Sequence, residues 1–489
     1  MEKKILINEL DSDENRIAAI QDNKLEQFHI ETTAKEVTQG NIYKGIVTRV
    51  EPSLQAVFVD YGAPKNGFLQ KNEIHTDYFQ DVEAGAKALF HLIKKGQELI
   101  VHVTKDPISQ KGAMLTTFIS LPGRLSVLMP GNSTKGVSRK ISDEDERKRL
   151  VNIIKKMDIP SGFGMIVRTA GKDSTKTLLT ADLKYLMRVW KNIDKEAIKN
   201  TAPSLLYKEQ TLAVRSLRDY FTSDVNEILI DSPEIFKEVQ TFMSIIAPKQ
   251  KKIVKLFKGD KPIFSKYQLE DQIASIYKKE VPLKSGGFLV IEQTEALVSI
   301  DVNSGKSTKK KNIEETAFHT NFEACEEVAR QLRLRDMGGL IVVDFIDMKD
   351  RRHKAEITKT LKKELKSDKA KTKIGGITPF GLLEMSRQRI RHSITFGSYE
   401  ICRHCKGRGQ TPSVETQGLA FLRQLNLKTI KPEVKEATGI VPSDVAGYLL
   451  NKKREELSEI ESKRSIAITI EGDPKMISGE NKIIIITPN

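Results

Sequence analysis

Residues 299–304 read Ser-Ile-Asp-Val-Asn-Ser and residues 340–344 read Leu-Ile-Val-Val-Asp, so two apolar strands each end in polar side chains. Because side chains alternate between the two faces of a strand, Asp301 and Asn303 project from the same face. Carboxylates at neighbouring strand ends, here Asp301 and Asp344, suit Mg²⁺, whose other positions are taken by water and substrate phosphate oxygens. Such an ion activates water and offsets the charge of a phosphodiester during cleavage.

Two alternatives to this metal site stay open on the sequence alone. Acidic residues at strand ends often cap helices or form turns and take no part in catalysis. Asp347, three residues after Asp344, is a rival ligand, although it faces differently from Asp344 if the strand continues that far.

The segments around these strands predict an α/β core. Residues 288–291 and 296–300 form apolar strands, and a helix follows from Asn312, with a glutamate at capping-box spacing, to Gly338-Gly339. Residues 349–373 carry eleven Lys or Arg against four Asp or Glu, a net charge of +7, which indicates a helix with one basic face.

Nearer the N-terminus, short strands separated by turns predict a small β-barrel. We expect its strands at residues 42–50, 55–60, 67–69, 98–104 and 113–119. Its aromatic side chains are candidates for stacking on unpaired bases and its lysines for binding phosphates: Phe58, Phe68, Tyr43, Tyr61, Lys44 and Lys111. The alternative is that these rings belong to the barrel core, and their surface exposure decides between the two.

The composition is that of a large, basic, globular protein. Its 489 residues predict two to four hydrophobic cores. The 80 Lys and Arg exceed the 65 Asp and Glu, a net charge of +15, which favours a polyanionic partner such as nucleic acid, although solubility alone also explains it. Three cysteines exclude a disulfide framework. The N-terminus lacks the apolar core of a secretory signal and no apolar run approaches the roughly 18 residues of a membrane span, so we expect a cytoplasmic protein.

Cys402 and Cys405 form a Cys-x-x-Cys pair followed by two glycines, which leave the backbone free to donate hydrogen bonds to sulfur. A redox role requires a thioredoxin-like setting, which the sequence does not indicate. Because zinc prefers four ligands and Cys325 lies apart in the predicted helix, the pair predicts a zinc ion shared by two copies of the chain. His404 or His392 completing an intrachain site is the alternative.

The remaining segments contain one candidate phosphate site. Residues 138–247 mix helical stretches such as 143–156 with strands at 163–168 and 227–230. Arg168 and Thr169, at a strand end, offer a guanidinium fork and a hydroxyl to a phosphate, although a solvated strand end is the favoured interpretation of this dipeptide alone. Beyond residue 413, a helix at 445–458 and strands at 465–470 and 482–487 predict a small α/β unit.

Six motifs resemble those of the ribonuclease E/G family and extend over essentially the whole chain. They are Asn-Ile-Tyr-Lys-Gly at 41–45, Val-Arg-Thr-Ala-Gly at 167–171, Ser-Ile-Asp-Val-Asn-Ser at 299–304, Ala-Arg-Gln-Leu-Arg-Leu-Arg-Asp at 329–336, Val-Asp-Phe-Ile-Asp-Met at 343–348 and Gly-Leu-Leu-Glu-Met-Ser-Arg-Gln-Arg at 381–389.

The resemblance implies a multidomain α/β fold. Its expected parts are a ribonuclease H-like domain at 1–36 and 213–276, an inserted S1 (OB-type) RNA-binding β-barrel at 37–118, a 5′-sensor domain at 119–212, a deoxyribonuclease I-like α/β catalytic domain at 277–398, a zinc link at 399–412 and a small α/β C-terminal domain at 413–489.

The resemblance also implies roles for individual residues. It assigns Mg²⁺ to Asp301 and Asp344, with Asn303 assisting at the scissile phosphate, and Zn²⁺ to Cys402 and Cys405 of paired protomers. It assigns RNA gripping to Phe58, Phe68 and Lys111, and sensing of a 5′-monophosphate to Gly123, Val127, Arg168 and Thr169. Lys371 stands at a sensor position that is arginine in the best-known ribonuclease E. Lysine keeps the charge but loses the bidentate fork, so we expect a weaker preference for the monophosphate.

The activity implied is Mg²⁺-dependent endonucleolytic hydrolysis of single-stranded, A/U-rich RNA, leaving 5′-phosphate and 3′-hydroxyl ends and favouring 5′-monophosphorylated substrates. Ribosomal RNA maturation and messenger RNA decay are both expected settings, with a zinc-linked homodimer or a tetramer as the assembly. The sequence shows no long disordered scaffold, which makes it most similar to the ribonuclease G branch. The alternative is a non-catalytic S1-type RNA-binding scaffold, which leaves the acidic strand ends unexplained.

Overall fold

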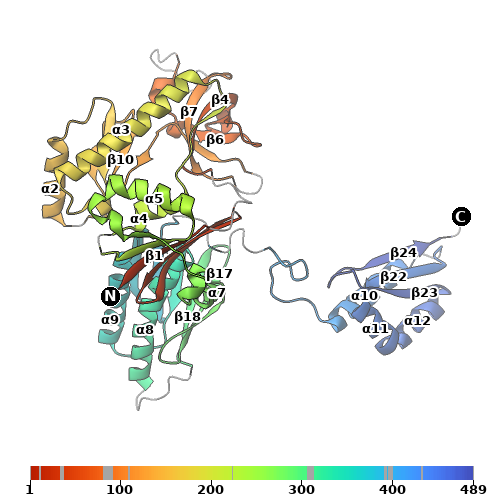
Figure 1. Cartoon of the computed structure of the whole chain (residues 1–489). Coiled ribbons are helices and arrows are strands. Elements are labelled where there is room, and N and C mark those ends of the chain that lie inside the picture. The colour runs from red at the N-terminus through yellow and green to blue at the C-terminus, as the bar shows by residue number, and fades with distance from the viewer. Residues whose placement is uncertain are drawn as a thin grey trace. The chain divides into compact units, whose positions relative to one another are not determined.

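The computed structural model describes residues 2–9, 13–32, 38–80, 92–107, 111–141, 143–222, 224–305, 313–389, 394, 400–430 and 433–487 (Figure 1). Its internal contacts divide the chain into two compact units, Met1–Ile394 and Thr395–Asn489. Within the described ranges, the first unit contains four sheets and the second contains one.

Two segments far apart in the sequence form the first sheet, in the strand order β15, β14, β1, β2, β3. Its strands are β1 (Lys3–Asn8), β2 (Glu14–Gln21), β3 (Lys24–Thr32), β14 (Glu227–Ile230) and β15 (Val254–Leu256). Ile5, Leu6 and Ile7 are consecutive and all buried, so both faces of β1 are covered. Helices α4 (Leu212–Tyr220) and α5 (Pro233–Ile246) share a core with Ile5 and Ile7, whereas α6 (Ile263–Lys266) and α7 (Glu270–Ile276) share one with Leu6.

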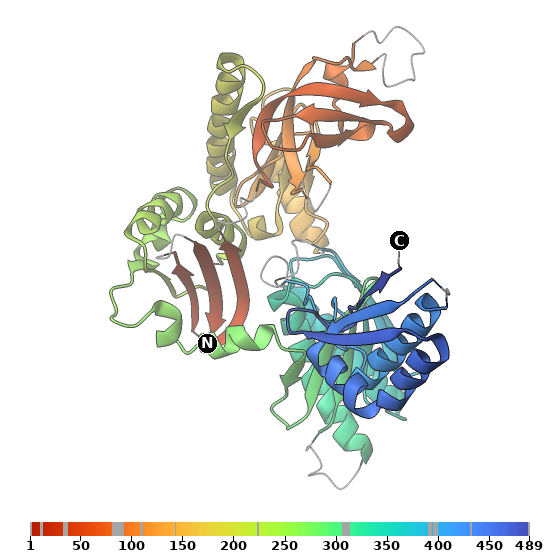
Figure 2. The same cartoon turned by 90° about the vertical axis from the view of Figure 1, so that its right-hand side faces the viewer.

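The second sheet closes on itself as a small barrel, which lies beside the long helix α3 (Figure 2). Its strands are β4 (Ile42–Glu51), β5 (Ala56–Asp60), β6 (Gly67–Gln70), β7 (Glu98–Lys105) and β8 (Met114–Thr116). The ring closes because β4 pairs with both β5 and β7. Gly45 fits there because a Cβ would lie 2.6 Å from Cγ1 of Val59. The predicted β-barrel is confirmed, and β13 (Ser204–Tyr207) pairs with the start of β4.

The third sheet has the strand order β11, β12, β10, β9 and carries two helices. Its strands are β9 (Leu121–Pro122), β10 (Ser126–Pro130), β11 (Lys135–Val137) and β12 (Phe163–Val167). Helix α2 (Glu144–Lys155) begins where the Asp143 carboxylate accepts hydrogen bonds from the Asp145 and Glu146 backbone N–H groups. Helix α3 (Lys176–Lys199) buries Leu179, Leu183 and Leu186, which are spaced to lie along one helical face.

The fourth sheet, in the order β16, β17, β18, β19, β21, β20, holds the predicted acidic strand ends. Its strands are β16 (Glu280–Pro282), β17 (Phe288–Gln293), β18 (Leu297–Asn303), β19 (Gly339–Asp344), β20 (Thr372–Ile377) and β21 (Leu382–Arg387). Helices α8 (Ile313–Leu334) and α9 (Arg351–Glu364) pack on the face that carries Ile300 and Ile341 (Figure 1). Asp301 and Asp344 are exposed because alternation along each strand turns them away from that core.

Two boundaries differ from the sequence-based expectation. Helix α8 ends at Leu334, before Gly338, and Asp336 adopts a left-handed backbone conformation with φ of +48°. The basic stretch is helical only as far as Glu364, apart from a short 3₁₀ turn that follows it. A buried ion pair between Arg387 and Asp368, 2.6 Å from Nε to Oδ2, holds the next turn and leads the chain into β20. Asn312, the expected helix cap, lies outside the described residues.

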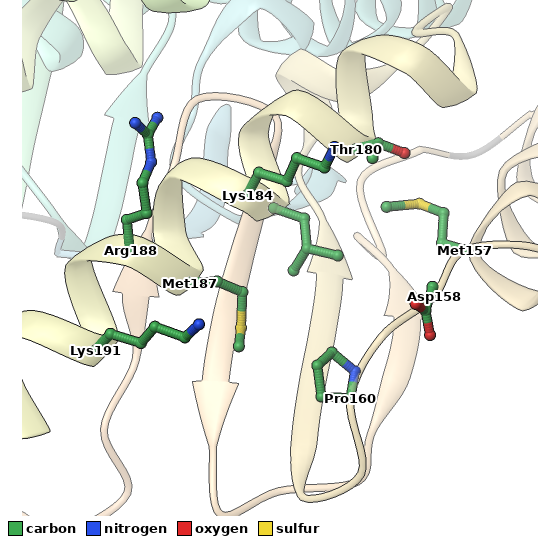
Figure 3. A pocket seen from close by; sticks show the side chains of 9 residues that line it. Met157, Asp158, Pro160, Thr180, Lys184, Met187, Arg188 and Lys191 are labelled. Carbon is green, nitrogen blue, oxygen red and sulfur yellow. The ribbon is translucent and has the colours of Figure 1, made fainter.

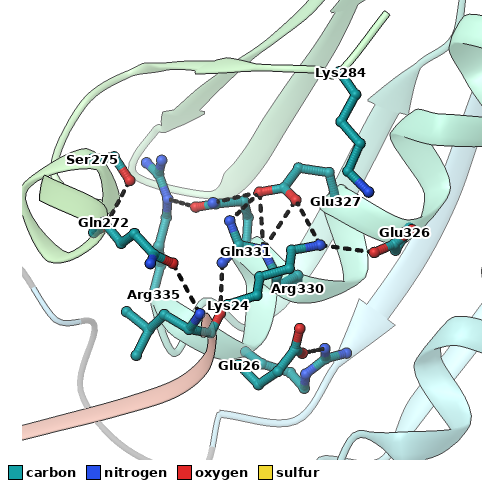
Figure 4. Close-up of polar contacts among 12 residues, drawn as sticks. Lys24, Glu26, Gln272, Ser275, Lys284, Glu326, Glu327, Arg330, Gln331 and Arg335 are labelled. Carbon is teal, nitrogen blue, oxygen red and sulfur yellow. Dashed lines mark hydrogen bonds and ion pairs between the residues drawn. The ribbon is translucent and has the colours of Figure 1, made fainter. Parts of the chain in front are cut away.

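A buried polar network joins α8 to the first sheet (Figure 4). Arg330 donates to the Leu25 carbonyl of β3 at 2.6 Å and to the Glu327 carboxylate at 2.8 Å. Gln331 donates to Glu327 and accepts from Nε of Arg335 at 2.7 Å. The motif at 329–336 therefore holds α8 against the first sheet: Arg330 and Arg333 bond to β3, and Arg335 bonds to Gln331.

The second unit is a three-stranded sheet with three helices among its described residues. It consists of α10 (Val414–Lys428), β22 (Glu436–Pro442), α11 (Ser443–Lys452), α12 (Arg454–Arg464), β23 (Ala467–Asp473) and β24 (Lys482–Ile486), with β22 at the centre of the sheet. The predicted helix at 445–458 is two helices separated at Lys453, and α10 and β22 were not predicted. In the described part of the chain, no helix is long and apolar enough to cross a membrane.

Candidate active site

Asp301 and Asp344 lie directly opposite each other in neighbouring parallel strands. The register of β18 and β19 pairs Ile300 with Val343 and Asp301 with Asp344. Adjacent strands are roughly 4.8 Å apart and paired residues project to the same side, so the two carboxylates lie side by side on the exposed face of the sheet, near the carboxyl ends of these two inner strands. The structure thus brings together the two acids that the strand pattern predicted.

Asn303 completes this cluster from the same face of β18. Its Nδ2 donates a hydrogen bond to Oδ2 of Asp301 at 2.7 Å. The amide therefore orients the carboxylate of Asp301, and its own carbonyl oxygen stays available to a ligand at the strand ends.

The position of Asp347 follows from where β19 stops. Because the strand ends at Asp344, the alternation that would have placed Asp347 on the other face does not apply. Burial and the negative charges of Asp301 and Asp347 raise the pKa of Asp344 above its usual range. Gly381, with φ of +83°, lies against these acids, since a Cβ there would be 3.1 Å from Oδ1 of Asp347. Asp347 therefore borders the cluster and stays a candidate ligand.

Asn321 of α8 is a positioning residue that sequence reasoning missed. Its side chain is fully buried, donates to the Ile346 carbonyl at 2.8 Å and accepts from the Ile346 backbone N–H at 3.0 Å. This pair of bonds fixes the loop between Asp344 and Asp347. A buried asparagine in the middle of a helix was the available signal, because such an amide requires polar partners.

The donor set fits Mg²⁺ better than a metal that needs a complete protein cage. Among the described residues, no group of three or more His, Cys, Asp or Glu side chains is placed to hold a metal ion. Mg²⁺ needs only one or two carboxylates, because water and substrate phosphates complete its octahedron. Asp301, Asp344 and Asp347 repel one another because they carry like charges close together, and a bound cation would offset this repulsion.

The barrel presents an aromatic pair on its outer face. The rings of Phe58 and Phe68 are half-buried, with centroids 5.8 Å apart and planes at 64°. The guanidinium of Arg49 lies 4.7 Å from the Phe58 centroid, and sequence reasoning missed this residue. Tyr61 is buried, and Tyr43 packs against it at 5.1 Å, so these two tyrosines belong to the core.

The two predicted lysines of the barrel differ in their surroundings. Lys111 is exposed, and the backbone N–H of Phe68 donates to the Ala113 carbonyl at 2.7 Å, which holds the Lys111 segment alongside the aromatic pair. Lys44 pairs with Glu98 at 2.9 Å and donates to the Asn200 carbonyl at 3.1 Å. The structure therefore places the backbone of the Lys111 segment beside Phe68, whereas Lys44 is engaged by Glu98 and Asn200.

Arg168 and Gly123 meet at one end of the third sheet. Arg168 Nη1 donates to the Gly123 carbonyl and Nη2 to Asp219 Oδ1, both at 2.6 Å. Gly123 must be glycine, because a Cβ would lie 2.6 Å from the buried Asp182 carboxylate. Although burial opposes it, the charges of Arg168 and its cationic neighbours lower the pKa of Asp219. Asp182 and Asp219 organise this end of the sheet and had no sequence signal.

The other residues predicted for the sensor lie around this point. Val127 is on β10, whose pairing with β12 places it beside the strand that leads to Arg168. The Thr169 hydroxyl is exposed and lies 3.4 Å from that of Ser138. Lys371 is exposed and lies close to Lys140. Burial and the positive charge of Lys371 lower the pKa of Lys140, and the charge of Asp368 opposes this shift.

The Cys-x-x-Cys pair lies in a glycine-containing turn of the second unit. Hydrogen bonds from the backbone N–H groups of Gly409 and Gly407 lower the pKa of the Cys405 thiol, which favours the thiolate that zinc binds. Cys402 and His404 are exposed, whereas burial in the first unit raises the pKa of Cys325 to about 12. The alternative ligand His392 lies outside the described residues.

A hollow on α3 lies apart from all of these residues. It has a volume of about 530 Å³ and contains Met157, Leu183 and Met187, with Lys184, Arg188 and Lys191 along the helix (Figure 3). None of the residues predicted to have a function lines it.

Three family models match the chain. The model of the Ribonuclease E/G family matches residues 120–390, that of the S1 RNA binding domain residues 36–106, and that of the RNase E/G thioredoxin-like domain residues 401–486. The last match corrects the expectation that a thioredoxin-like setting is absent. The Cys-x-x-Cys pair nevertheless precedes α10 by several residues and lies in a turn, not at a helix N-terminus as in redox-active pairs.

Curated relatives of two kinds are similar to the chain. Ribonuclease E of Haemophilus influenzae is 45% identical over 471 residues, 96% of this chain and 50% of that protein. Ribonuclease E of Escherichia coli is 42% identical over 466 residues, 94% of this chain and 44% of that protein. Ribonuclease G of Haemophilus influenzae is 39% identical over 425 residues, 86% of each protein. The chain spans about half the length of the ribonuclease E relatives, and with this coverage and the matched family model it belongs to the ribonuclease E/G family.

Proposed function

We propose that the protein is a Mg²⁺-dependent endoribonuclease that hydrolyses phosphodiester bonds in single-stranded, A/U-rich RNA. The observation that carries this proposal is the direct register of Asp301 with Asp344, with Asn303 bonded to Asp301 at 2.7 Å. Two carboxylates side by side on the exposed face of a sheet, in a chain with an S1 RNA-binding domain, suit cleavage of an RNA backbone.

The roles of the residues follow from their positions. Asp301 and Asp344 would hold Mg²⁺, which when bound supplies a nucleophilic water and neutralises charge on the phosphate. Asn303 keeps the Asp301 carboxylate oriented, and the second N–H of its Nδ2 would donate to a non-bridging phosphate oxygen. Hydrolysis that leaves the phosphate on the downstream fragment yields 5′-phosphate and 3′-hydroxyl ends.

We propose that the half-buried aromatic pair on the outer face of the barrel binds the RNA. The half-buried rings of Phe58 and Phe68 provide stacking surface, and Arg49 and Lys111 provide charge for phosphates beside it. Stacking of bases on these rings requires an unpaired strand, which supports the choice of single-stranded substrates.

We also propose that the end of the third sheet recognises a 5′-monophosphate. Gly123, Val127, Arg168 and Thr169 supply backbone, hydroxyl and guanidinium groups around one point, and Lys371 adds an exposed ammonium near it. Arg168 already donates to Gly123 and Asp219, so Lys371 supplies much of the positive charge that is available to the 5′-phosphate. Lysine lacks the bidentate fork of arginine. The preference for 5′-monophosphorylated RNA is therefore expected to be modest.

We propose that Zn²⁺ links two protomers through Cys402 and Cys405 of each chain. Two thiolates supply half of a tetrahedral site, and the backbone donors to Cys405 stabilise its thiolate form. A homodimer follows, with a tetramer as its further assembly, acting in the cytoplasm on ribosomal RNA precursors, messenger RNA or both.

The sheets of the first unit suggest finer fold assignments. We propose that β1–β3 with β14 and β15 form a ribonuclease H-like domain, interrupted by the barrel and by the 5′-sensor domain. The mixed sheet from β16 to β21 is proposed to be deoxyribonuclease I-like. The parallel pairing of β1 with β14 and the helix-covered face of the fourth sheet support these assignments.

A non-catalytic RNA-binding scaffold is the competing function. It accounts for the net charge, the barrel and the cysteine pair, but not for two exposed carboxylates in register on neighbouring inner strands. Substitution of Asp301 separates the two functions, because a scaffold does not need that carboxylate to be charged.

The test compares Asp301→Asn with the parent protein on a single-stranded RNA labelled at both ends. We expect the variant to bind RNA with unchanged affinity and to lose cleavage in Mg²⁺ by at least about 1000-fold, since it removes a metal ligand. Glu295→Gln, the same change of charge in the turn at the far end of β18, is the matched control and should cut normally. Cleavage by Asp301→Asn at the parent rate contradicts the proposed site.

The same assay tests the sensor with RNA carrying either a 5′-monophosphate or a 5′-hydroxyl. Lys371→Gln should lower the rate ratio between the two RNAs, and Lys371→Arg should raise it by up to about 10-fold, the value of one good charged hydrogen bond. Because Lys371 is exposed, neither change should affect folding. Equal ratios in all three proteins contradict a sensing role for Lys371.

A further inference from the structure

A second surface feature of the barrel lies at the end of the aromatic pair's strands. A hollow of about 610 Å³ opens there, and the residues that matter for its chemistry are Leu54, Gln55, Gln70, Asn72, Ile74 and Phe118. It is separate from the acidic strand ends and contains none of the residues assigned above to RNA gripping.

The register of β5 and β6 makes this hollow continuous with the Phe58–Phe68 pair. Phe58 pairs with Phe68 and Ala56 pairs with Gln70, so Gln70 follows Phe68 on the same outer face two residues along β6. The hollow also includes Leu54, from the turn that joins the first two barrel strands. In OB-type barrels this turn and the adjacent strands bind oligonucleotides.

The walls of the hollow are apolar and partly exposed. Leu54 is 55% exposed and Phe118 is 40% exposed, whereas Ile74 at 3% forms a buried floor. The Phe118 ring is held edge-on by His75 with centroids 5.5 Å apart. Large apolar side chains left open around a hollow mark a site for a ligand, and an aromatic wall suits a flat base.

Two amides supply the polar groups of the hollow. The side chains of Gln70 and Asn72 form no hydrogen bond with any described residue, whereas Gln55 is already engaged by the Pro52 carbonyl at 2.8 Å. A carboxamide presents a donor and an acceptor side by side, which matches N6 and N7 of adenine. Unpaired bases in RNA are read in this way along their edges.

We propose that this hollow takes an adenine base of a single-stranded RNA whose neighbouring nucleotide stacks on Phe58 and Phe68. Gln70 and Asn72 read the edge of the base, and Phe118 and Leu54 enclose its faces. The inference rests on the proposed function for RNA as the ligand, but it concerns binding and not cleavage. With this hollow beside it, the Phe58–Phe68 surface would bind most tightly those RNAs that carry an adenosine next to the stacked nucleotide.

The test measures fluorescence anisotropy of labelled uridine oligonucleotides that carry adenosine, uridine, cytidine or guanosine at one central position, in buffer without metal. The parent should bind the adenosine RNA at least about 5-fold more tightly than the others, the lower value of one bidentate base contact. The Gln70→Ala, Asn72→Ala double variant should lose this preference and retain the affinity for the uridine RNA. Phe118→Ala should weaken binding of the adenosine RNA by about 5-fold or more, as loss of one stacked base does.

Gln293→Ala, an exposed amide on β17, is the matched control and should keep the adenosine preference. If the parent protein shows no preference among the four bases, the proposed recognition of adenine is wrong. It is also wrong if the Gln70→Ala, Asn72→Ala variant keeps the preference for adenosine. If the Phe118→Ala variant binds RNA as tightly as the parent does, the hollow does not bind a base and the proposed site is wrong. The hollow would then have another occupant, such as a protein segment. These measurements involve binding only and no cleavage. If the Asp301→Asn variant cuts RNA, the proposed function is wrong, but the affinity ratios between the four RNAs still test the adenine site.

Discussion

Glu9 and Asp344 are both carboxylates at the end of a strand, yet their environments differ. Asp344 is exposed beside Asp301, whereas Oε1 of Glu9 is buried without a hydrogen-bond partner among the described residues. Burial and the nearby charges of Glu238, Asp231 and other acids raise the pKa of Glu9 to about 7. Glu9 is therefore largely protonated in the folded protein below neutral pH.

The Glu9→Gln substitution should stabilise the protein in a pH-dependent way. The folded-state pKa lies above the ordinary value of 4.5, so the folded state binds the extra proton and unfolding free energy falls as pH rises from about 4.5 to about 7. Relative to the parent, Glu9→Gln should gain about 2 kcal/mol at pH 8, a value reduced for partial exposure, and little near pH 5.

Urea unfolding across this pH range measures the effect. Glu280→Gln, an exposed glutamate on β16, should leave the profile of the parent unchanged. A gain that is equal at pH 5 and pH 8 argues against a buried, protonated Glu9.

At the scale of elements, the motif at 329–336 holds α8 against the first sheet. An arginine-rich segment in a basic protein favours an RNA contact, but Arg330 and Arg333 of α8 bond to Leu25 and Glu26 of β3. Burial lowers the pKa of Arg335 to about 10, with the Glu327 charge opposing the shift. The motif thus positions α8, and through it the sheet that carries Asp301 and Asp344.

Glu327→Ala should destabilise the first unit by about 3 kcal/mol, because it removes a buried carboxylate and leaves the partly buried Arg330 guanidinium without its ion-pair partner. The neighbouring Glu326→Ala is the matched control, since Glu326 pairs with Lys24 at the exposed surface and should cost only about 0.5 kcal/mol. Denaturant unfolding of both variants makes the comparison. Equal losses would show that the network does not hold α8.

At the scale of the whole molecule, the proposed zinc site takes two thiolates, Cys402 and Cys405, from each of two chains. Cys402→Ser should remove bound zinc and convert the dimer to a monomer, because four thiolates from two chains are needed. Cys325→Ala, which removes the buried thiol of the first unit, should keep both zinc and assembly state. Metal analysis together with light scattering checks this, and an unchanged dimer after Cys402→Ser rules out the shared site.

Strand alternation and local charge in the sequence determined much of the fold and the core of the candidate site. Asp301, Asn303 and Asp344 were predictable because a period of two assigns side chains to faces without knowledge of distant contacts. The barrel strands and the basic character of residues 349–364 were predictable for similar local reasons.

Only the tertiary structure decided features that depend on residues far apart in the sequence. Asp347 borders the acidic cluster because β19 ends at Asp344. The basic helix stops at Glu364, and the chain after it is held by the ion pair between Asp368 and Arg387. Lys44 forms an ion pair with Glu98 and is therefore not free to bind RNA beside the aromatic pair. Asn321, Asp182, Asp219 and the amides of Gln70 and Asn72 gained their roles in the same way. Whether a polar side chain meets a partner or solvent depends on which elements pack beside it, and no local pattern records that.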